Sequence, residues 1–240
     1  MHVTLAAVNE SLPVMLIPGL LDSARLYAPQ IPALWSTGPV MVADHTRDDS
    51  MAAIAARILT NAPPVFALVG LSMGGYIAFE IVRQAPQRVA RLALLDTSAR
   101  ADTPEQSAAR RTQMALASQG RFSQVLDAQF PRLVGRSRRT DTSLRELLDL
   151  MAQEVGVAAF TRQQAAIMGR MDSRPTLGGI RCPTLVLVGE DDELTPPERA
   201  VEMAEGIAGA RLVSVPRCGH MSTLEQPDEV TRALLEWLRA

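Results

Sequence analysis

The sequence predicts an α/β fold, a mainly parallel sheet with helices on both faces. Two observations support this prediction. Apolar runs of strand length alternate with amphipathic runs of helical spacing along the 240-residue chain. In addition, a Gly-x-Ser-x-Gly sequence stands between the apolar run 65–69 and an amphipathic run that starts at Tyr76, as in a sharp strand-to-helix turn. Because 47% of the residues are hydrophobic, the chain can bury a substantial core, and we expect a single α/β domain with an insertion.

Seven apolar runs are predicted strands, and four amphipathic runs are predicted helices of the layers beside the sheet. The strands are 3–7, 14–17, 39–43, 65–69, 91–95, 184–188 and 211–215. The helices are 50–60, 75–85, 197–207 and 227–239. Ser50 is the expected N-cap of the first helix, because a serine hydroxyl can accept a hydrogen bond from a free backbone N–H of the first turn.

The Gly-x-Ser-x-Gly sequence, Gly70 to Gly74, predicts that Ser72 is a nucleophile. A serine on such a turn has strained backbone geometry, and side chains two residues away on either side would clash with the neighbouring strand and helix. The predicted strand before the serine and the predicted helix after it support this assignment.

Two later segments supply candidate partners for Ser72. An acidic loop, Glu190 to Glu193, follows the predicted strand 184–188. A Gly-His pair at 219–220 follows the predicted strand 211–215. The acid and the histidine thus come after the serine in the chain, each just beyond a strand.

With these segments the chain resembles the α/β-hydrolase family, in which serine, acid and histidine occur in this order. The resemblance covers nearly the whole chain. Its pattern of a glycine, an acid three residues later and a proline four residues beyond the acid falls on Gly189, Asp192 and Pro196. The family histidine corresponds to His220, and Asp191 is the alternative acid.

The resemblance implies a Ser-His-Asp triad, in which the histidine takes the proton of the serine and later gives it to the leaving group. A neutral imidazole as base predicts a rate that rises with pH through an apparent pKa of roughly 6 to 7. The developing oxyanion needs two donors, which we assign to the backbone N–H groups of Met73, after the serine, and Leu20, after an early strand. The family commonly has His-Gly where this chain has Pro18-Gly19, so the sequence does not show which residue holds this loop in place.

Three other residues are assigned structural roles. His45 also follows a predicted strand, but it precedes the serine, so a structural role or a substrate contact is preferred to that of the base. Cys182 and Cys218 are the two cysteines, and their separation suits reduced, buried thiols better than a disulfide framework.

In the middle of the chain helical spacing replaces the strand pattern, which predicts a helical cap inserted into the core. The predicted boundaries are 98–178 for the cap, and 1–97 with 179–240 for the α/β-hydrolase core. Two sequences have the pattern of a capping box at a helix start, Thr103-Pro104-Glu105-Gln106 and Ser143-Leu144-Arg145-Glu146.

Two cap helices have an apolar face. The faces comprise Phe122, Val125, Leu126 and Phe130 in one helix and Leu144, Leu147, Leu148 and Met151 in the other. Such faces more often form core than pocket, but a cap must bury one face against the top of the sheet, where Ser72 lies. We therefore expect an apolar acyl or alcohol pocket lined by some of five residues, Phe122, Phe130, Met151, Phe160 and Met168.

Composition argues against some classes of partner. A net charge of −2 gives no overall drive toward nucleic acid or membranes. No basic start with a long apolar run and no stretch of membrane-spanning length occurs, so a cytoplasmic protein is expected. All 24 basic residues are arginines, which indicates coding bias, as in a GC-rich bacterial genome. The triad chemistry predicts neither a metal nor an organic cofactor.

Charge is nevertheless segregated within the chain. The segment between Ser98 and Gly178 has twelve arginines against eight acidic residues, whereas the rest has twelve against eighteen. The densest part contains Arg132, Arg136, Arg138 and Arg139. A positive cap would favour an anionic substrate, either a small ester or lactone with a free carboxylate or an acyl group on an acidic acyl-carrier protein. A solvated surface cluster is the equally weighted alternative.

The function expected from these residues is hydrolysis of a carboxylic ester or lactone through an acyl-serine intermediate. The same triad also serves cofactor-free haloperoxidases or perhydrolases and carbon–carbon bond hydrolases, which are therefore alternatives. A ligand receptor of this fold that keeps the triad but turns over slowly is a further alternative.

Overall fold

The computed structural model describes residues 11–240. Its six strands form one sheet in the order β2-β1-β3-β4-β5-β6, in which all neighbours are parallel. The strands are β1 (Val14–Ile17), β2 (Val40–Val42), β3 (Phe66–Leu71), β4 (Val89–Leu95), β5 (Thr184–Gly189) and β6 (Arg211–Val215). The predicted α/β fold class is confirmed, and the predicted strand 3–7 lies outside the described residues.

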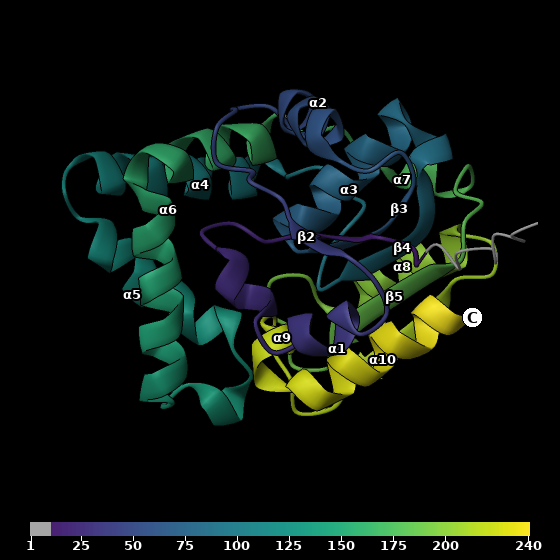
Figure 1. Ribbon diagram of the computed structural model, residues 1–240. Helices are drawn as coiled ribbons and strands as arrows, with labels where there is room; N and C mark the ends of the chain where they lie inside the picture. Colours follow the sequence, from purple (N-terminus) through teal and green to yellow (C-terminus); the bar gives the residue numbers. More distant parts are fainter. Residues whose placement is uncertain (1–10) are drawn as a thin grey trace, which may run out of the picture.

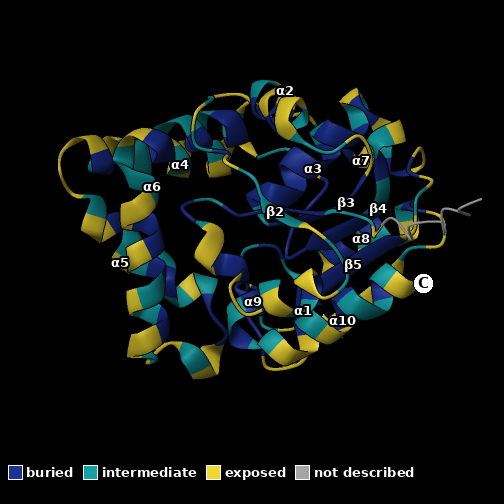
Figure 2. Cartoon of the chain, viewed as in Figure 1, coloured by how far each residue is buried: buried dark blue, intermediate teal, exposed yellow. Residues whose placement is uncertain are grey.

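Helices cover both faces of the sheet (Figure 1). One core layer contains α2 (Met51–Asn61), α3 (Met73–Gln84), α7 (Arg174–Leu177) and α8 (Pro197–Gly206). The other contains α1 (Ile31–Trp35) and α10 (Pro227–Arg239), with α9 (Ser222–Glu225) beside α10. Alternate residues of each strand enter opposite layers, so Leu68 packs with the first and Val69 with the second. Figure 2 shows β3, β4, β5 and α3 as mostly buried, whereas the edge strands β2 and β6 are more exposed.

The predicted helix start at Ser50 is correct, since the Ser50 hydroxyl accepts a hydrogen bond from Ala53 N at 3.3 Å. Helix α3 begins at Met73, two residues before the predicted start, because the chain passes from the turn at Ser72 directly into the helix. Ser72 is the N-cap residue of α3, so the turn and the first free N–H groups of the helix lie together.

Three longer helices are inserted between β4 and β5: α4 (Pro104–Ser118), α5 (Phe122–Leu133) and α6 (Thr142–Met168). They lie together at one side of the sheet in Figure 1. The predicted capping box at Thr103 and Gln106 is formed. The second predicted box is wrong: Asp141 caps α6 by accepting from Leu144 N at 2.9 Å, so Ser143 lies inside the helix. An aspartate two residues upstream offers the same acceptor, and the helix starts earlier.

Candidate active site

Ser72 occupies the turn between β3 and α3 in a conformation that non-glycine residues rarely adopt, with φ 55° and ψ −116°. The turn requires close backbone approach on both sides. A Cβ atom at Gly70 would stand 2.3 Å from the carbonyl oxygen of Gly74, and one at Gly74 would stand 2.0 Å from that of Ile17. The two glycines of the motif are therefore steric requirements of the turn that presents Ser72.

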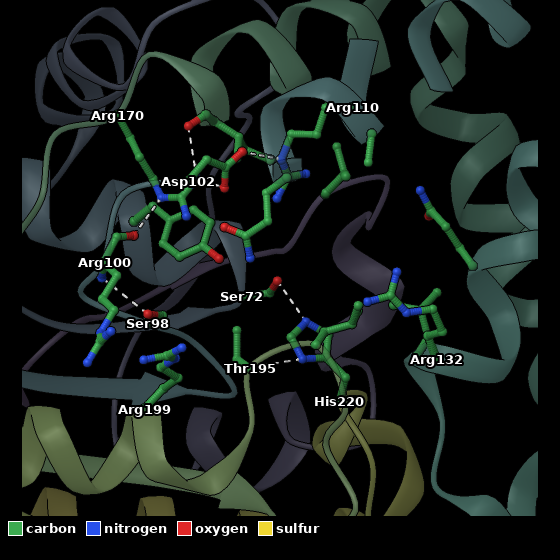
Figure 3. A pocket seen from close by; sticks show the side chains of 18 of the residues that line it. Ser72, Ser98, Arg100, Asp102, Arg110, Arg132, Arg170, Thr195, Arg199 and His220 are labelled. Atoms are coloured by element: carbon green, nitrogen blue, oxygen red, sulfur yellow. Dashed lines mark hydrogen bonds and ion pairs between the residues drawn. The ribbon is translucent and has the colours of Figure 1, made fainter. Parts of the chain in front are cut away.

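The structure brings Ser72, His220 and Asp192 into one hydrogen-bonded chain, of which Figure 3 shows the Ser72–His220 bond. His220 Nε2 lies 2.8 Å from Ser72 Oγ, and His220 Nδ1 lies 2.8 Å from Asp192 Oδ2. The three residues come from the loops after β3, β5 and β6, whose carboxyl ends meet at one edge of the sheet. This arrangement can move a proton from the serine hydroxyl to the imidazole.

The loop after β5 holds the Asp192 carboxylate firmly. Oδ1 accepts hydrogen bonds from the backbone N–H groups of Leu194 and Thr195, and Oδ2 accepts one from the Thr195 hydroxyl as well as that from His220. Burial opposes ionisation, but the adjacent imidazole and these hydrogen bonds outweigh it, so the pKa of Asp192 is below its ordinary value. Asp191, the alternative acid, contributes its backbone N–H to Cys218 O and does not contact His220 in the described structure.

The His220 loop is fastened to the inserted segment. The buried carboxylate of Glu225 accepts from the backbone N–H groups of Gly135, Gly219 and Met221 at 2.7, 3.0 and 3.2 Å. His220 N also donates to Leu133 O at the end of α5. The position of the imidazole thus depends on contacts between the β6 side of the sheet and the inserted helices.

Three carboxyl groups influence the charge of His220. Burial lowers the pKa of the imidazole, but the charge and hydrogen bond of Asp192, followed by the charges of Asp96 and Asp22, raise the pKa of His220 to about 9. Asp96 does not bond to the histidine: it accepts from Gly189 N and from the Ser222 hydroxyl. We therefore expect the rise of the rate with pH, predicted from the sequence at roughly pH 6 to 7, at higher pH.

The expected oxyanion donors lie beside Ser72. The N–H of Met73 is the first in helix α3, and a Cβ atom at Gly19, just before Leu20, would stand only 3.3 Å from Ser72 Cβ. His45 supplies the brace that the sequence left open, because its Nε2 lies 2.8 Å from Gly19 O and must donate to that carbonyl. Burial lowers the pKa of His45, which keeps the ring neutral in this role. The structural role preferred for His45 agrees with this contact.

A cavity of about 240 Å³ opens above Ser72. Its lining mixes polar and apolar side chains and contains five arginines, Arg100, Arg110, Arg132, Arg170 and Arg199. The predicted lining residues are wrong: none of Phe122, Phe130, Met151, Phe160 and Met168 borders this cavity. Its apolar side chains are others, among them Leu20, Tyr76, Leu133, Ile167 and Met221. Phe160 and Met151 are fully buried, Phe122 packs on Phe160 with ring centroids 5.4 Å apart, and Phe130 borders a separate cavity of about 20 Å³.

These apolar side chains pack among themselves and against residues 18–21 after β1, which we call the oxyanion loop. Phe160 and Val125 share a cluster with Leu21, and Met151 belongs to the core layer of α1 and α10. The helices thus bury these side chains in helix–helix and helix–loop contacts. The residues that they present to the cavity are others, including Arg110, Gln113 and Arg132 beside Leu133 and Ile167.

The dense arginine cluster also lies differently from the expectation. Arg132 borders the cavity, but Arg136 and Arg139 pair with Glu193, and Arg138 pairs with Asp141. Arg136, Arg138 and Arg139 thus take part in ordinary surface ion pairs. Four of the five cavity arginines do come from the positively charged segment 98–178, so the segment was chosen correctly and the individual residues were not.

Sequence reasoning missed two buried acids near the triad, Asp22 and Asp96. Asp22 borders the cavity, its Oδ2 has no hydrogen-bond partner in the described structure, and burial raises the pKa of Asp22 to about 7. Asp96 could have been found because it follows the predicted strand 91–95 directly. Within residues 11–240 no three His, Cys, Asp or Glu side chains gather as a metal site.

Comparison with known proteins places the chain in a family. A family model described as "Alpha/beta hydrolase family" matches residues 11–233. The chain therefore belongs to the α/β-hydrolase family, as its fold and its strand-end residues indicate.

Individual relatives are hydrolases of several kinds. A thermophilic esterase from Thermogutta terrifontis, solved with malate bound, is 32% identical with a TM-score of 0.87, and the match covers 95% of this chain and 89% of that one. The enol-lactonase from Burkholderia xenovorans LB400 is 24% identical with a TM-score of 0.86, covering 96% and 92%, and indicates the shared fold. A 2-hydroxy-6-oxononadienedioate/2-hydroxy-6-oxononatrienedioate hydrolase from Paraburkholderia xenovorans is 27% identical over 85% of this chain and 73% of that protein. The chain is thus similar to hydrolytic enzymes.

Proposed function

We propose that this hydrolase cleaves a carboxylic ester or lactone through an acyl-serine intermediate. The observation that carries the proposal is the hydrogen-bonded chain from Ser72 Oγ through His220 to Asp192 at the base of an open cavity. The similarity to a bacterial esterase at 32% identity supports the ester as substrate.

In the proposed reaction, neutral His220 accepts the Ser72 proton at Nε2 while the serine oxygen attacks the carbonyl carbon. Asp192 keeps the Nδ1 proton in place and stabilises the imidazolium that forms. The backbone N–H groups of Leu20 and Met73 hold the oxyanion. Collapse of the tetrahedral species breaks the ester bond, and the histidine protonates the leaving alcohol. Water then repeats these steps on the acyl-serine and releases the acid.

Cys218 is a poor candidate for the nucleophile. Its thiol is buried, and burial together with nearby carboxylates raises its pKa far above the ordinary range. Ser72, by contrast, borders the cavity and contacts the histidine directly.

The proposal is tested by assaying the wild type and Ser72→Ala with a panel of simple ethyl esters and lactones. Ser72→Ala removes the attacking oxygen, so kcat should fall at least about a thousandfold while the circular dichroism spectrum stays unchanged. The wild type should show many turnovers per molecule, which a slow receptor would not. Activity of the variant above a few per cent would contradict the assignment of Ser72. Formation of a peracid from a carboxylic acid and hydrogen peroxide, or cleavage of a carbon–carbon bond, in place of ester hydrolysis would contradict the substrate class.

A further inference from the structure

The cavity above Ser72 has an excess of positive charge. Five arginines border it, whereas the bordering carboxyl groups are those of Asp22 and Asp102. Burial raises the pKa of Asp22 to about 7, so at most two carboxylates face the five arginines. An ester without charge would gain nothing from this excess.

Two of the arginines are held in place by Asp102. The Asp102 side chain is 1% exposed and accepts from Arg110 Nε and Arg170 NH1, each at 2.7 Å. Arg170 also lies over the Tyr76 ring, 4.1 Å from its centroid. This group therefore keeps one net positive charge in a rigid, largely buried arrangement.

The remaining arginines differ in their partners. Arg100 makes a two-pronged pair with Glu202 at 2.8 and 2.9 Å. Within residues 11–240, neither Arg132 nor Arg199 has a carboxylate partner. Of the five cavity arginines these two make no ion pair in the described part of the chain, although the charge of Arg199 also acts on Glu202, the partner of Arg100.

Arg199 and Arg132 lie on different sides of Ser72 (Figure 3). Arg199 belongs to the first turn of α8, directly after the loop that holds Asp192, and lies on the side of Arg100 and Arg170. We call the set Arg100, Arg110, Arg170 and Arg199 the basic wall. Arg132, from α5, lies apart from this wall beside His220.

We propose that the substrate carries a carboxylate in addition to the scissile ester or lactone bond, and that Arg199 on the basic wall binds this carboxylate. The inference rests on the proposed function. A guanidinium can form two parallel hydrogen bonds with a carboxylate, and the fixed positive charge of the Arg110–Arg170–Asp102 group strengthens the attraction at the same wall. The cavity also presents uncharged donors there, the side chains of Gln106 and Gln113.

Matched substrates test the charge of the ligand. Monoethyl adipate and ethyl hexanoate differ by a carboxylate in place of the terminal methyl, and place the charge in the acyl half. The pair 4-acetoxybenzoate and methyl 4-acetoxybenzoate places it in the alcohol half. For at least one pair, kcat/KM of the wild type should be about tenfold higher for the anionic member, and the ratio should shrink between about 0.05 M and about 0.5 M NaCl.

Three variants test which arginine binds the carboxylate of the substrate. Arg199→Gln should reduce the anionic-to-neutral ratio of kcat/KM about tenfold, mainly through KM for the anionic ester. Arg132→Gln, on the other side of Ser72, should leave the ratio within about twofold. Arg139→Gln, whose guanidinium pairs with Glu193 at the surface, serves as the control for net charge. Arg110 and Arg170 are not used, since their loss would leave Asp102 buried and unbalanced.

Several results would overturn the inference. They are a wild-type ratio near one for both substrate pairs, equal losses for both members in Arg199→Gln, and a lowered ratio in Arg132→Gln alone. Absence of hydrolysis of every ester would instead overturn the proposed function. Calorimetry with adipate then still measures the carboxylate site, because Arg199→Gln should weaken the dissociation constant about tenfold, and an unchanged constant would overturn the site as well.

Discussion

Two regions border the cavity above Ser72: the loops that hold Ser72, Asp192 and His220, and the basic wall. They differ in how their charges are balanced. In the loops each buried charge has a full set of partners: Asp192 accepts four hydrogen bonds, and Glu225 accepts three from backbone N–H groups. In the wall, Asp102 balances only one of the two arginines that it holds, and Arg199 has no carboxylate partner in the described residues.

This difference indicates a division of tasks. Groups that must act on a reacting bond gain from a fixed, dry environment with no competing partner. Groups that recognise a ligand must keep hydrogen-bonding capacity free until the ligand arrives. We therefore expect changes in the triad loops to affect all esters equally, and changes in the wall to separate anionic esters from neutral ones.

The largest effect is expected for Asp192→Asn. The amide cannot stabilise the imidazolium and can favour the wrong tautomer of His220, so kcat should fall about 10³- to 10⁴-fold for neutral and anionic esters alike. Steady-state kinetics with both members of a matched pair measure this, with Asp191→Asn as the neighbouring control. Similar losses in both variants, or a loss confined to anionic esters, would contradict the division between loops and wall.

An intermediate effect is expected for His45→Ala. Without its donor the Gly19 carbonyl loses a buried hydrogen bond, the Leu20 N–H shifts, and kcat should fall about tenfold to a hundredfold with little change in KM. His45→Gln should recover part of the rate, because an amide N–H can still donate. A thermal melt checks that both variants are folded. A rate unchanged in His45→Ala would show that the oxyanion loop is held without this brace.

The smallest effect concerns Asp22, which borders the same cavity but belongs to neither region. The catalytic base must be neutral, so kcat/KM should rise with pH through the pKa of His220, which is raised above 6.5 to about 9. Removing a nearby negative charge lowers that pKa, so Asp22→Asn should move the rising limb to lower pH by about 0.5 to 1 unit. The exposed Asp49→Asn is the control. If the rising limb stays in place or moves to higher pH, the charge of Asp22 does not raise the pKa of His220.

Much of the fold and of the triad was predictable because the signals are local. Strands and helices of the sheet layers follow from the period of their apolar residues, as at 65–69 and 227–239. The positions of Ser72, Asp192 and His220 follow from a further rule. Each stands just after a parallel strand, and the carboxyl ends of such strands share one edge of the sheet.

The tertiary structure alone decided what borders the cavity. The sequence predicts that the apolar face with Phe122 is buried, but not whether it borders the cavity above Ser72 or, as it does, packs against Phe160 and neighbouring helices. Likewise, an arginine's free charge depends on partners that are distant in the chain. Arg170 is bound by Asp102, Arg139 by Glu193, and Arg199 by neither, and only three-dimensional packing determines such pairings, because charge acts through space and not along the sequence.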